Sequence, residues 1–398
     1  MKFLIKLILL LLCTQLHAHE EHARSLKSML SISVAFDAHG GLWRASVKDN
    51  FVVADVSRDL GKSFSKSIQI NLQPQKIGAD GEARPKIAIG PEGNIYLTWT
   101  EALKKPFSGY IWFARSINQG RSFEKPHIVH QDRSEITHRF DALNISKNGN
   151  VTVAWVDKRD LIAAKSAGKV YDGAAIYYAH SLDNGASFTT EQKLADGSCE
   201  CCRIALTNKP DGTAVAMWRH VFAGNERDHM LAEIPQSAGQ APIVQRATFG
   251  RWKIDGCPHH GAALASGGEA KDWWGYHMAW FDGGNDDTGK NASLFYARMD
   301  GEAWVSSPAK KIGNHKNQAG HPALISIGEK VWLVWRETDA KTSMIMGMFS
   351  DDDGRSWGEV KMIARTANQA DYPQLITKDK QAYLAWNTLK DGLQLIPL

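Results

Sequence analysis

Hydrophobic and polar residues alternate in short runs along most of the chain, and turn residues separate the runs. Runs such as Ile-Tyr-Leu-Thr-Trp, from 95 to 99, are rich in the aromatic and β-branched residues that are typical of strands. No long segment carries the 3.6-residue period of an amphipathic helix. The pattern therefore predicts an all-β protein.

A longer unit, a strand, a turn and a second strand ending in Trp, recurs along the chain. Successive Trp residues of this unit lie 51 to 63 residues apart, a period expected of propeller blades. They are Trp43, Trp99, Trp155, Trp218, Trp280, Trp335 and Trp386. We therefore predict one β-propeller domain of seven four-stranded antiparallel blades. The last unit, from 372 to 398, lacks a fourth strand, which residues 24–29 are expected to supply.

Four octapeptides share the pattern Ser-x-Asp/Asn-x-Gly-x-Ser-Phe/Trp. They begin at Ser57, Ser116, Ser181 and Ser350. The Asp or Asn side chain can accept backbone N–H groups, the Gly takes a positive φ, and the aromatic residue packs beneath. Each octapeptide is therefore expected to connect the third strand of a unit to its fourth.

The octapeptides resemble the Asp-box, or bacterial neuraminidase repeat, of the sialidase superfamily. The resemblance covers nearly all of the chain after residue 18 and implies a propeller fold. Sialidases have six blades, so six is the alternative to the count of seven. Asp boxes also occur in propellers that are not sialidases, so the resemblance indicates a fold more strongly than an activity.

The first 18 residues resemble a secretory signal, because Lys2 and Lys6 precede an apolar run from 7 to 12. Cleavage would leave residues 19–398 as a single domain, periplasmic or secreted. No later segment approaches the roughly 20 apolar residues of a membrane helix. The formal charge of +4 is too small for a nucleic-acid binder of this length.

Candidate metal ligands gather where the first strands of three successive blades begin. Such positions lie near the axis of a propeller, so residues far apart in the sequence are expected to meet there. Thiolates and imidazoles suit Cu(I) and zinc. The Cys-x-Cys-Cys run is also similar to that of bacterial exported copper-cluster proteins, and His19 and His22 offer further copper ligands. We therefore predict a metal site, copper favoured over zinc, formed by Cys199, Cys201, Cys202, Cys257, His259, His260 and His321.

Two other interpretations remain open at this stage. The cysteines can form structural disulfides, for example Cys202 with Cys257, in a propeller that binds a ligand or a protein without catalysis. Alternatively, the sialidase resemblance implies a glycosidase in which three arginines hold the substrate carboxylate and a tyrosine is the nucleophile. The corresponding residues here are Arg84, Arg139, Arg203 and Tyr372, although the Arg-Ile-Pro motif of the family is absent. The expected partner is accordingly a metal ion or a small anionic or glycan ligand.

Overall fold

The computed structural model describes residues 26–237, 239–268, 271–285 and 291–398. The predicted signal, 1–18, and the candidate ligands His19 and His22 lie outside these residues. Within the part of the chain that is described, no helix is long and apolar enough to cross a membrane.

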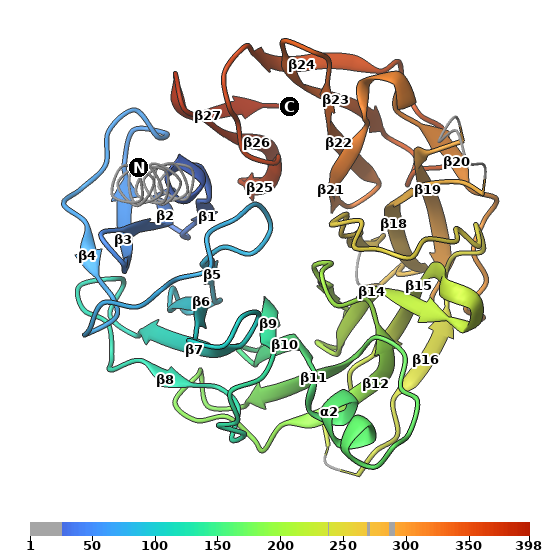
Figure 1. The fold of residues 1–398 in the computed structure, drawn as a ribbon. Helices are drawn as coiled ribbons and strands as arrows, with labels where there is room; N and C mark the ends of the chain where they lie inside the picture. Colours follow the sequence, from blue (N-terminus) through green and yellow to red (C-terminus); the bar gives the residue numbers. More distant parts are fainter. Residues whose placement is uncertain (1–25, 238, 269–270, 286–290) are drawn as a thin grey trace, which may run out of the picture.

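Antiparallel sheets form a ring, with the first strand of each nearest the centre and the last at the perimeter (Figure 1). Four separate sheets have four strands each, in sequence order. The first two are β1 (Ser33–Phe36), β2 (Leu42–Lys48), β3 (Phe51–Ser57) and β4 (Ile68–Gln69), then β5 (Lys86–Ile89), β6 (Ile95–Ala102), β7 (Gly109–Ser116) and β8 (His127–Ile128). The other two are β17 (Ala263–Gly267), β18 (Gly275–Asp282), β19 (Ser293–Asp300) and β20 (Lys310–Ile312), then β21 (Gly320–Ile327), β22 (Lys330–Thr338), β23 (Ser343–Ser350) and β24 (Lys361–Thr366).

Two further four-stranded units are joined into one eight-stranded sheet. The first contains β9 (His138–Ile145), β10 (Val151–Asp157), β11 (Ala174–Ser181) and β12 (Gln192–Ser198). The second contains β13 (Ala205–Asn208), β14 (Ala214–Phe222), β15 (Glu226–Glu233) and β16 (Ile243–Arg246). A single residue pair, Ser198 with His220, connects β12 to β14. The cysteine triplet begins immediately after this junction, at Cys199.

A three-stranded sheet of β25 (Gln374–Lys378), β26 (Gln381–Thr388) and β27 (Gly392–Pro397) lies between the first sheet and β21–β24. Its Ala385 packs with Ile32 and Leu42 on one side, and its Trp386 packs with Ile345 on the other. The all-β prediction and the four-stranded antiparallel units are confirmed. Residues 26–30 are helical rather than the expected extra strand, and Asn387 binds the carbonyls at the end of that helix, of Met29 and Leu30, at 3.0 Å.

The octapeptides form the turns after β3, β7, β11 and β23, as predicted. In the first turn, Gly61 has a φ of 85° and donates its N–H to Ser57 Oγ at 2.8 Å. Asp59 accepts the N–H of Ser63, four residues on, at 2.8 Å. The same contacts recur around Asp183 and Asp352.

The Trp residues of the repeat are the largest side chains of the core. Five of them are almost completely buried, namely Trp99, Trp155, Trp218, Trp335 and Trp386. Besides the helical residues 26–30, the described part of the chain has short helical connections at α2 (Arg159–Ser166) and at the 3₁₀ turns η1 (Ala223–Asn225) and η2 (His315–Asn317). Because sheets supply the core, the connections at their ends are free to carry chemistry.

Candidate functional site

Three cysteines meet at the junction between β12 and β13. Residues 200 and 201 form a turn, which brings Cys199, Cys201 and Cys202 onto one side of the chain. Their Sγ atoms are separated by 3.6 Å (199 to 201), 3.7 Å (199 to 202) and 4.0 Å (201 to 202). All three residues are buried, with 3%, 7% and 3% of their surface exposed, against Phe140 and Val221.

The sulfur triangle has the size that one metal ion requires. Thiolates bind zinc at about 2.3 Å, so two thiolates on one ion lie about 3.8 Å apart in tetrahedral geometry and about 4.0 Å apart in a trigonal plane. The three separations fall close to these values. A single ion at the centre of the triangle would therefore need only small side-chain movements.

A buried arginine is bonded to the cysteine triplet through its backbone. Arg219 is 1% exposed, and its backbone carbonyl accepts the N–H of Cys199 at 2.8 Å. Its side chain donates only to carbonyls, chiefly of Phe281 at 2.7 Å and His260 at 3.2 Å, and its Nε is unpaired. Among the described residues, no carboxylate lies within ion-pair distance of it.

Thiol hydrogen bonds and this cation favour one thiolate in the triplet. Hydrogen bonds from Cys201 and Cys202, and then the charge of Arg219, hold the pKa of Cys199 far below that of an ordinary thiol. Hydrogen bonding to Cys199 conversely raises the pKa of Cys201 and Cys202. Cys199 is therefore the thiol of the triplet whose thiolate form is most favoured.

The remaining predicted metal ligands lie elsewhere. Cys257 is exposed, and all four cysteines in the described ranges are free thiols. His259 is exposed on the same loop, whereas His260 and His321 face each other with ring centroids 4.6 Å apart. Among the described residues, the group close enough to hold one ion consists of the three cysteines alone.

His260 and His321 belong to a second cluster, which Glu82 holds together. Glu82 accepts hydrogen bonds from His321 Nδ1 and the Gly261 N–H, each at 3.3 Å, and pairs with Arg203 at 3.2 Å. Burial raises the pKa of Glu82, but Arg203 and His321 outweigh it and keep the carboxylate charged. One loop residue before β5 thus joins the connections before β13 and β17 to the start of β21.

A cavity of about 410 Å³ opens beside this cluster. Its lining includes His260, His315, His321, Arg336 and Thr338. Arg336 donates to Ser343 Oγ at 3.1 Å, and its Nε is unpaired. The rings of Tyr372 and His321 stack with their centroids 3.6 Å apart, and the guanidinium carbon of Arg336 lies 5.6 Å from the centroid of the Tyr372 ring.

The three arginines proposed from the sialidase resemblance each have separate partners. Arg84 is buried and forms a bidentate ion pair with Asp371, in which Arg84 Nη2 donates to Asp371 Oδ1 at 2.6 Å and Nη1 donates to Oδ2. Arg203 pairs with Glu82 and donates to the carbonyls of Ala262 and Pro322. Arg139 lies over the rings of Phe107 and Phe140. The structure instead brings Tyr372 close to a different arginine, Arg336.

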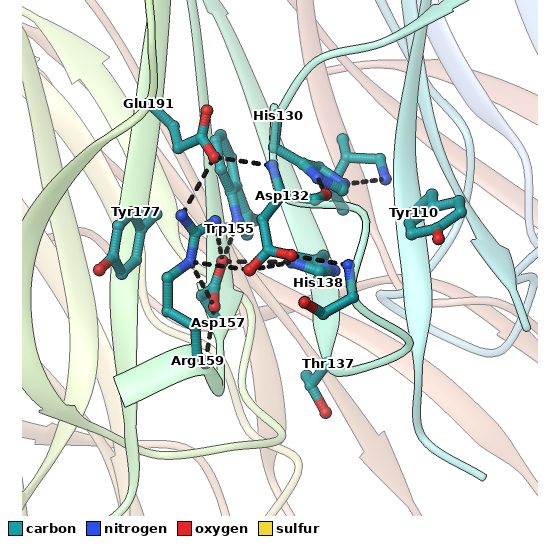
Figure 2. A network of polar contacts seen from close by, with 12 residues as sticks. Tyr110, His130, Asp132, Thr137, His138, Trp155, Asp157, Arg159, Tyr177 and Glu191 are labelled. Carbon is teal, nitrogen blue, oxygen red and sulfur yellow. Dashed lines mark hydrogen bonds and ion pairs between the residues drawn. The ribbon is translucent and has the colours of Figure 1, made fainter. Parts of the chain in front are cut away.

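Charged residues at the end of β10 form the network in Figure 2. Asp157 accepts the Trp155 indole N–H at 3.0 Å and pairs with Arg159 at 2.8 Å. Arg159 continues to Glu191 at 3.0 Å, and buried His138 lies 3.6 Å from Asp157. The indole contact, repeated by Trp335 and Glu337 at 2.8 Å, gives these carboxylates a structural role.

Buried histidines in this core predict acid sensitivity. Burial and then the charge of His138 lower the pKa of His130 to about 3, and burial lowers that of His277 to about 3. Because the unfolded chain then binds more protons below about pH 6.5, each histidine should remove about 1 kcal/mol of unfolding free energy per pH unit as the pH falls from about 6.5 toward the folded-state pKa of about 3.

Urea unfolding at several pH values checks this expectation. His130 Nε2 accepts the Ile111 N–H at 3.1 Å, and a Gln oxygen can accept the same bond without taking up a proton. His130→Gln should therefore lose about 1 kcal/mol less on acidification than the wild type. An identical pH slope in the variant would contradict the assignment.

Comparison with solved structures finds this architecture in carbohydrate-active proteins. An ulvan lyase of polysaccharide lyase family PL25, bound to -[GlcA(1-4)Rha3S]-, aligns with a TM-score of 0.55 and 13% identity over 91% of this chain and 92% of its own. The GH93 α-L-arabinofuranosidase of Fusarium graminearum aligns with a TM-score of 0.50 and 10% identity over 78% of this chain and 89% of its own. A Hadza microbial sialidase aligns with a TM-score of 0.48 and 13% identity over 90% and 73%, respectively.

No family model and no curated protein matches the sequence. At these identities, the likeness to the lyase and the arabinofuranosidase shows the fold alone. The predicted resemblance to propellers of the sialidase type is therefore confirmed for the fold. Function must be argued from the residues of this chain.

Glu82 is the site residue that sequence reasoning missed. It lies in an irregular segment between β4 and β5, without a motif or a periodic pattern around it. The available signal was position alone, since Glu82 is two residues from Arg84 at a predicted strand start. Its partners come from three distant segments of the chain, which no local pattern identifies.

Proposed function

We propose that this protein is an exported β-propeller that binds one thiophilic metal ion, copper in preference to zinc, through Cys199, Cys201 and Cys202. The observation that carries the proposal is the sulfur triangle, whose sides match two thiolates on a common ion. Arg219 supports it as a buried cation that has no carboxylate partner among the described residues and whose charge favours the Cys199 thiolate. Copper handling and metal-dependent chemistry are both compatible with such a site.

Copper is favoured because, among the described residues, three soft ligands and no fourth lie close enough together to bind one ion. Structural zinc sites almost always have four ligands, whereas thiolate ligands select Cu(I) without requiring a tetrahedron. Three thiolates with Cu(I) carry two negative charges, and Arg219 offsets one of them. A buried site with this charge needs such a counter-ion.

The proposal also includes the architecture and the location. We take the three-stranded sheet β25–β27 as the seventh blade, since it packs between the first sheet and β21–β24. Export rests on the sequence of residues 1–18, which would place the cysteines where oxidants and copper are both encountered.

Elemental analysis tests the metal proposal directly. Purified protein is reduced, loaded separately with Cu(I) and with zinc, and dialysed against buffer. We expect near-stoichiometric copper, with absorbance from copper–thiolate charge transfer. Retention of neither metal would overturn the proposal, and retention of zinc alone would overturn the preference.

The cavity beside Tyr372 favours a second candidate function, binding or cleavage of an anionic glycan. Its volume of about 410 Å³ is within the range of small-ligand sites, and Arg336, His315 and His321 line it. The solved neighbours are described as a polysaccharide lyase, an arabinofuranosidase and a sialidase. Tyr372 would then be the nucleophile or acid of the reaction.

Tyr372→Phe tests this candidate on fluorogenic sialosides and arabinofuranosides and on ulvan. If Tyr372 takes part in the chemistry, kcat should fall by about a hundredfold or more, because the phenol oxygen is lost. Tyr383→Phe, a change on β26, is the matched control and should leave kcat unchanged. No cleavage by the wild type, or equal rates in both variants, would remove the candidate.

A further inference from the structure

The three thiols differ in which disulfide they can form. A disulfide usually joins Cα atoms 4.4 to 6.8 Å apart. Cys201 and Cys202 are adjacent, so a trans peptide holds their Cα atoms only about 3.8 Å apart. That pair is therefore disfavoured.

Cys199 and Cys202 have the favourable geometry. They flank the turn formed by residues 200 and 201, and the ends of a four-residue turn lie within about 7 Å of each other. Their Sγ atoms are already 3.7 Å apart, and the sequence spacing is Cys-x-x-Cys. Rotation of the two side chains can bring the sulfur atoms into bonding contact without a new path for the backbone.

Cys201 completes the metal triangle but is not needed for this bridge. Its Sγ lies 3.6 Å from the Sγ of Cys199. A disulfide between these two residues would compete with the Cys199–Cys202 bridge, but it would have to close the shorter Cys-x-Cys segment. Cys257 is exposed and belongs to another loop. The geometry thus distinguishes one bridging pair from one remaining ligand.

We propose that Cys199 and Cys202 form a reversible disulfide that closes the metal site. The inference rests on the proposed function for its consequence, since the bridge removes two of the three metal ligands. In the reduced state the triangle holds the ion, and in the oxidised state Cys201 alone remains. Metal binding and oxidation therefore exclude each other.

The oxidant is a small disulfide such as oxidised glutathione, because the thiols are buried too deeply for a protein partner. Cys199 attacks one sulfur of the oxidant, its S–S bond breaks, and one small thiolate leaves. Cys202 then attacks Cys199 Sγ, and the second small thiolate leaves. Two thiol protons and two electrons pass to the oxidant, which becomes two thiols.

The experiment uses the wild-type chain, reduced and free of metal. It is incubated with oxidised glutathione, after which the free thiols are counted and the bridge is located by peptide mass analysis. We expect a loss of two thiols, a Cys199–Cys202 bridge, and Cu(I) affinity lower by more than about a thousandfold, restored by dithiothreitol. Bound Cu(I) should also slow the oxidation.

Variants identify the pair. Cys201→Ser should still form the bridge, Cys202→Ser should not form it, and Cys257→Ser should behave as the wild type. A bridge between Cys199 and Cys201, or one that includes Cys257, would overturn the inference.

The two proposals fail in different ways. If reduced protein binds Cu(I) but oxidised glutathione forms no Cys199–Cys202 bridge, the redox inference is wrong and the metal proposal stands. If the bridge forms but reduced protein binds no metal, the metal proposal is wrong and the redox pair stands.

Discussion

The Cys201→Ser variant is expected to lose Cu(I) affinity by about a thousandfold. Structural metal sites of this kind contribute about 10 to 16 kcal/mol through three or four ligands, so one thiolate is worth on the order of 4 kcal/mol. Serine keeps the size of the side chain, but its hydroxyl is a poor ligand for a soft ion. Competition with a chromophoric Cu(I) chelator measures the change.

Cys257→Ser is the matched control for this prediction. Cys257 is exposed and outside the sulfur triangle, so its substitution should leave both the affinity and the copper stoichiometry unchanged. Loss of copper in this variant, with retention in Cys201→Ser, would mean that the ion binds elsewhere. Thermal unfolding of the metal-free proteins checks that both variants fold.

Asp371→Asn is expected to lower the free energy of unfolding by about 3 to 5 kcal/mol, because it leaves a buried guanidinium without its charge partner. Arg84 and Asp371 are 7% and 4% exposed, and Arg84 also donates to the Ile32 carbonyl at 2.8 Å. The pair therefore connects the loop before β5, the segment before β1 and the segment before β25. Urea unfolding, monitored by tryptophan fluorescence, measures the loss.

Two comparisons make this prediction specific. Asp351→Asn changes an exposed carboxylate and should shift stability by less than about 0.5 kcal/mol. Replacing both partners, as Arg84→Met with Asp371→Leu, should recover much of the loss, since no buried charge is then left alone. If Asp371→Asn is as stable as the wild type, the pair does not hold the ring together.

The periodicity of the sequence predicted the fold. Alternating strands, the Trp spacing and the octapeptides predicted antiparallel four-stranded units, since side-chain direction alternates along a strand and a tight turn demands particular residues. These patterns are local and repeated, so they predict the blade unit without any knowledge of contacts between distant residues. The segment at 24–29 carried no such signal, and its expected strand was wrong for the described residues, which form a helix.

The sequence predicted only some of the residues that lie together in the candidate sites. The Cys-x-Cys-Cys run marked the metal candidate because its members are neighbours in the chain, and the turn at 200 and 201 brings them together. Cys257 and His321 seemed equally suitable by residue type. Only the tertiary structure separates them from the triangle, because the distance between residues of different blades depends on how the loops pack.

The sequence by itself determined the all-β class, the repeating unit and the identity of the thiol cluster. The tertiary structure decided that Glu82 joins Arg203 to His321, that Arg84 is paired with Asp371, and that Arg219 is buried without a carboxylate partner among the described residues. The reason is physical. Strands and turns are specified by residues a few positions apart, whereas a charged side chain finds its partner only after the ring has closed.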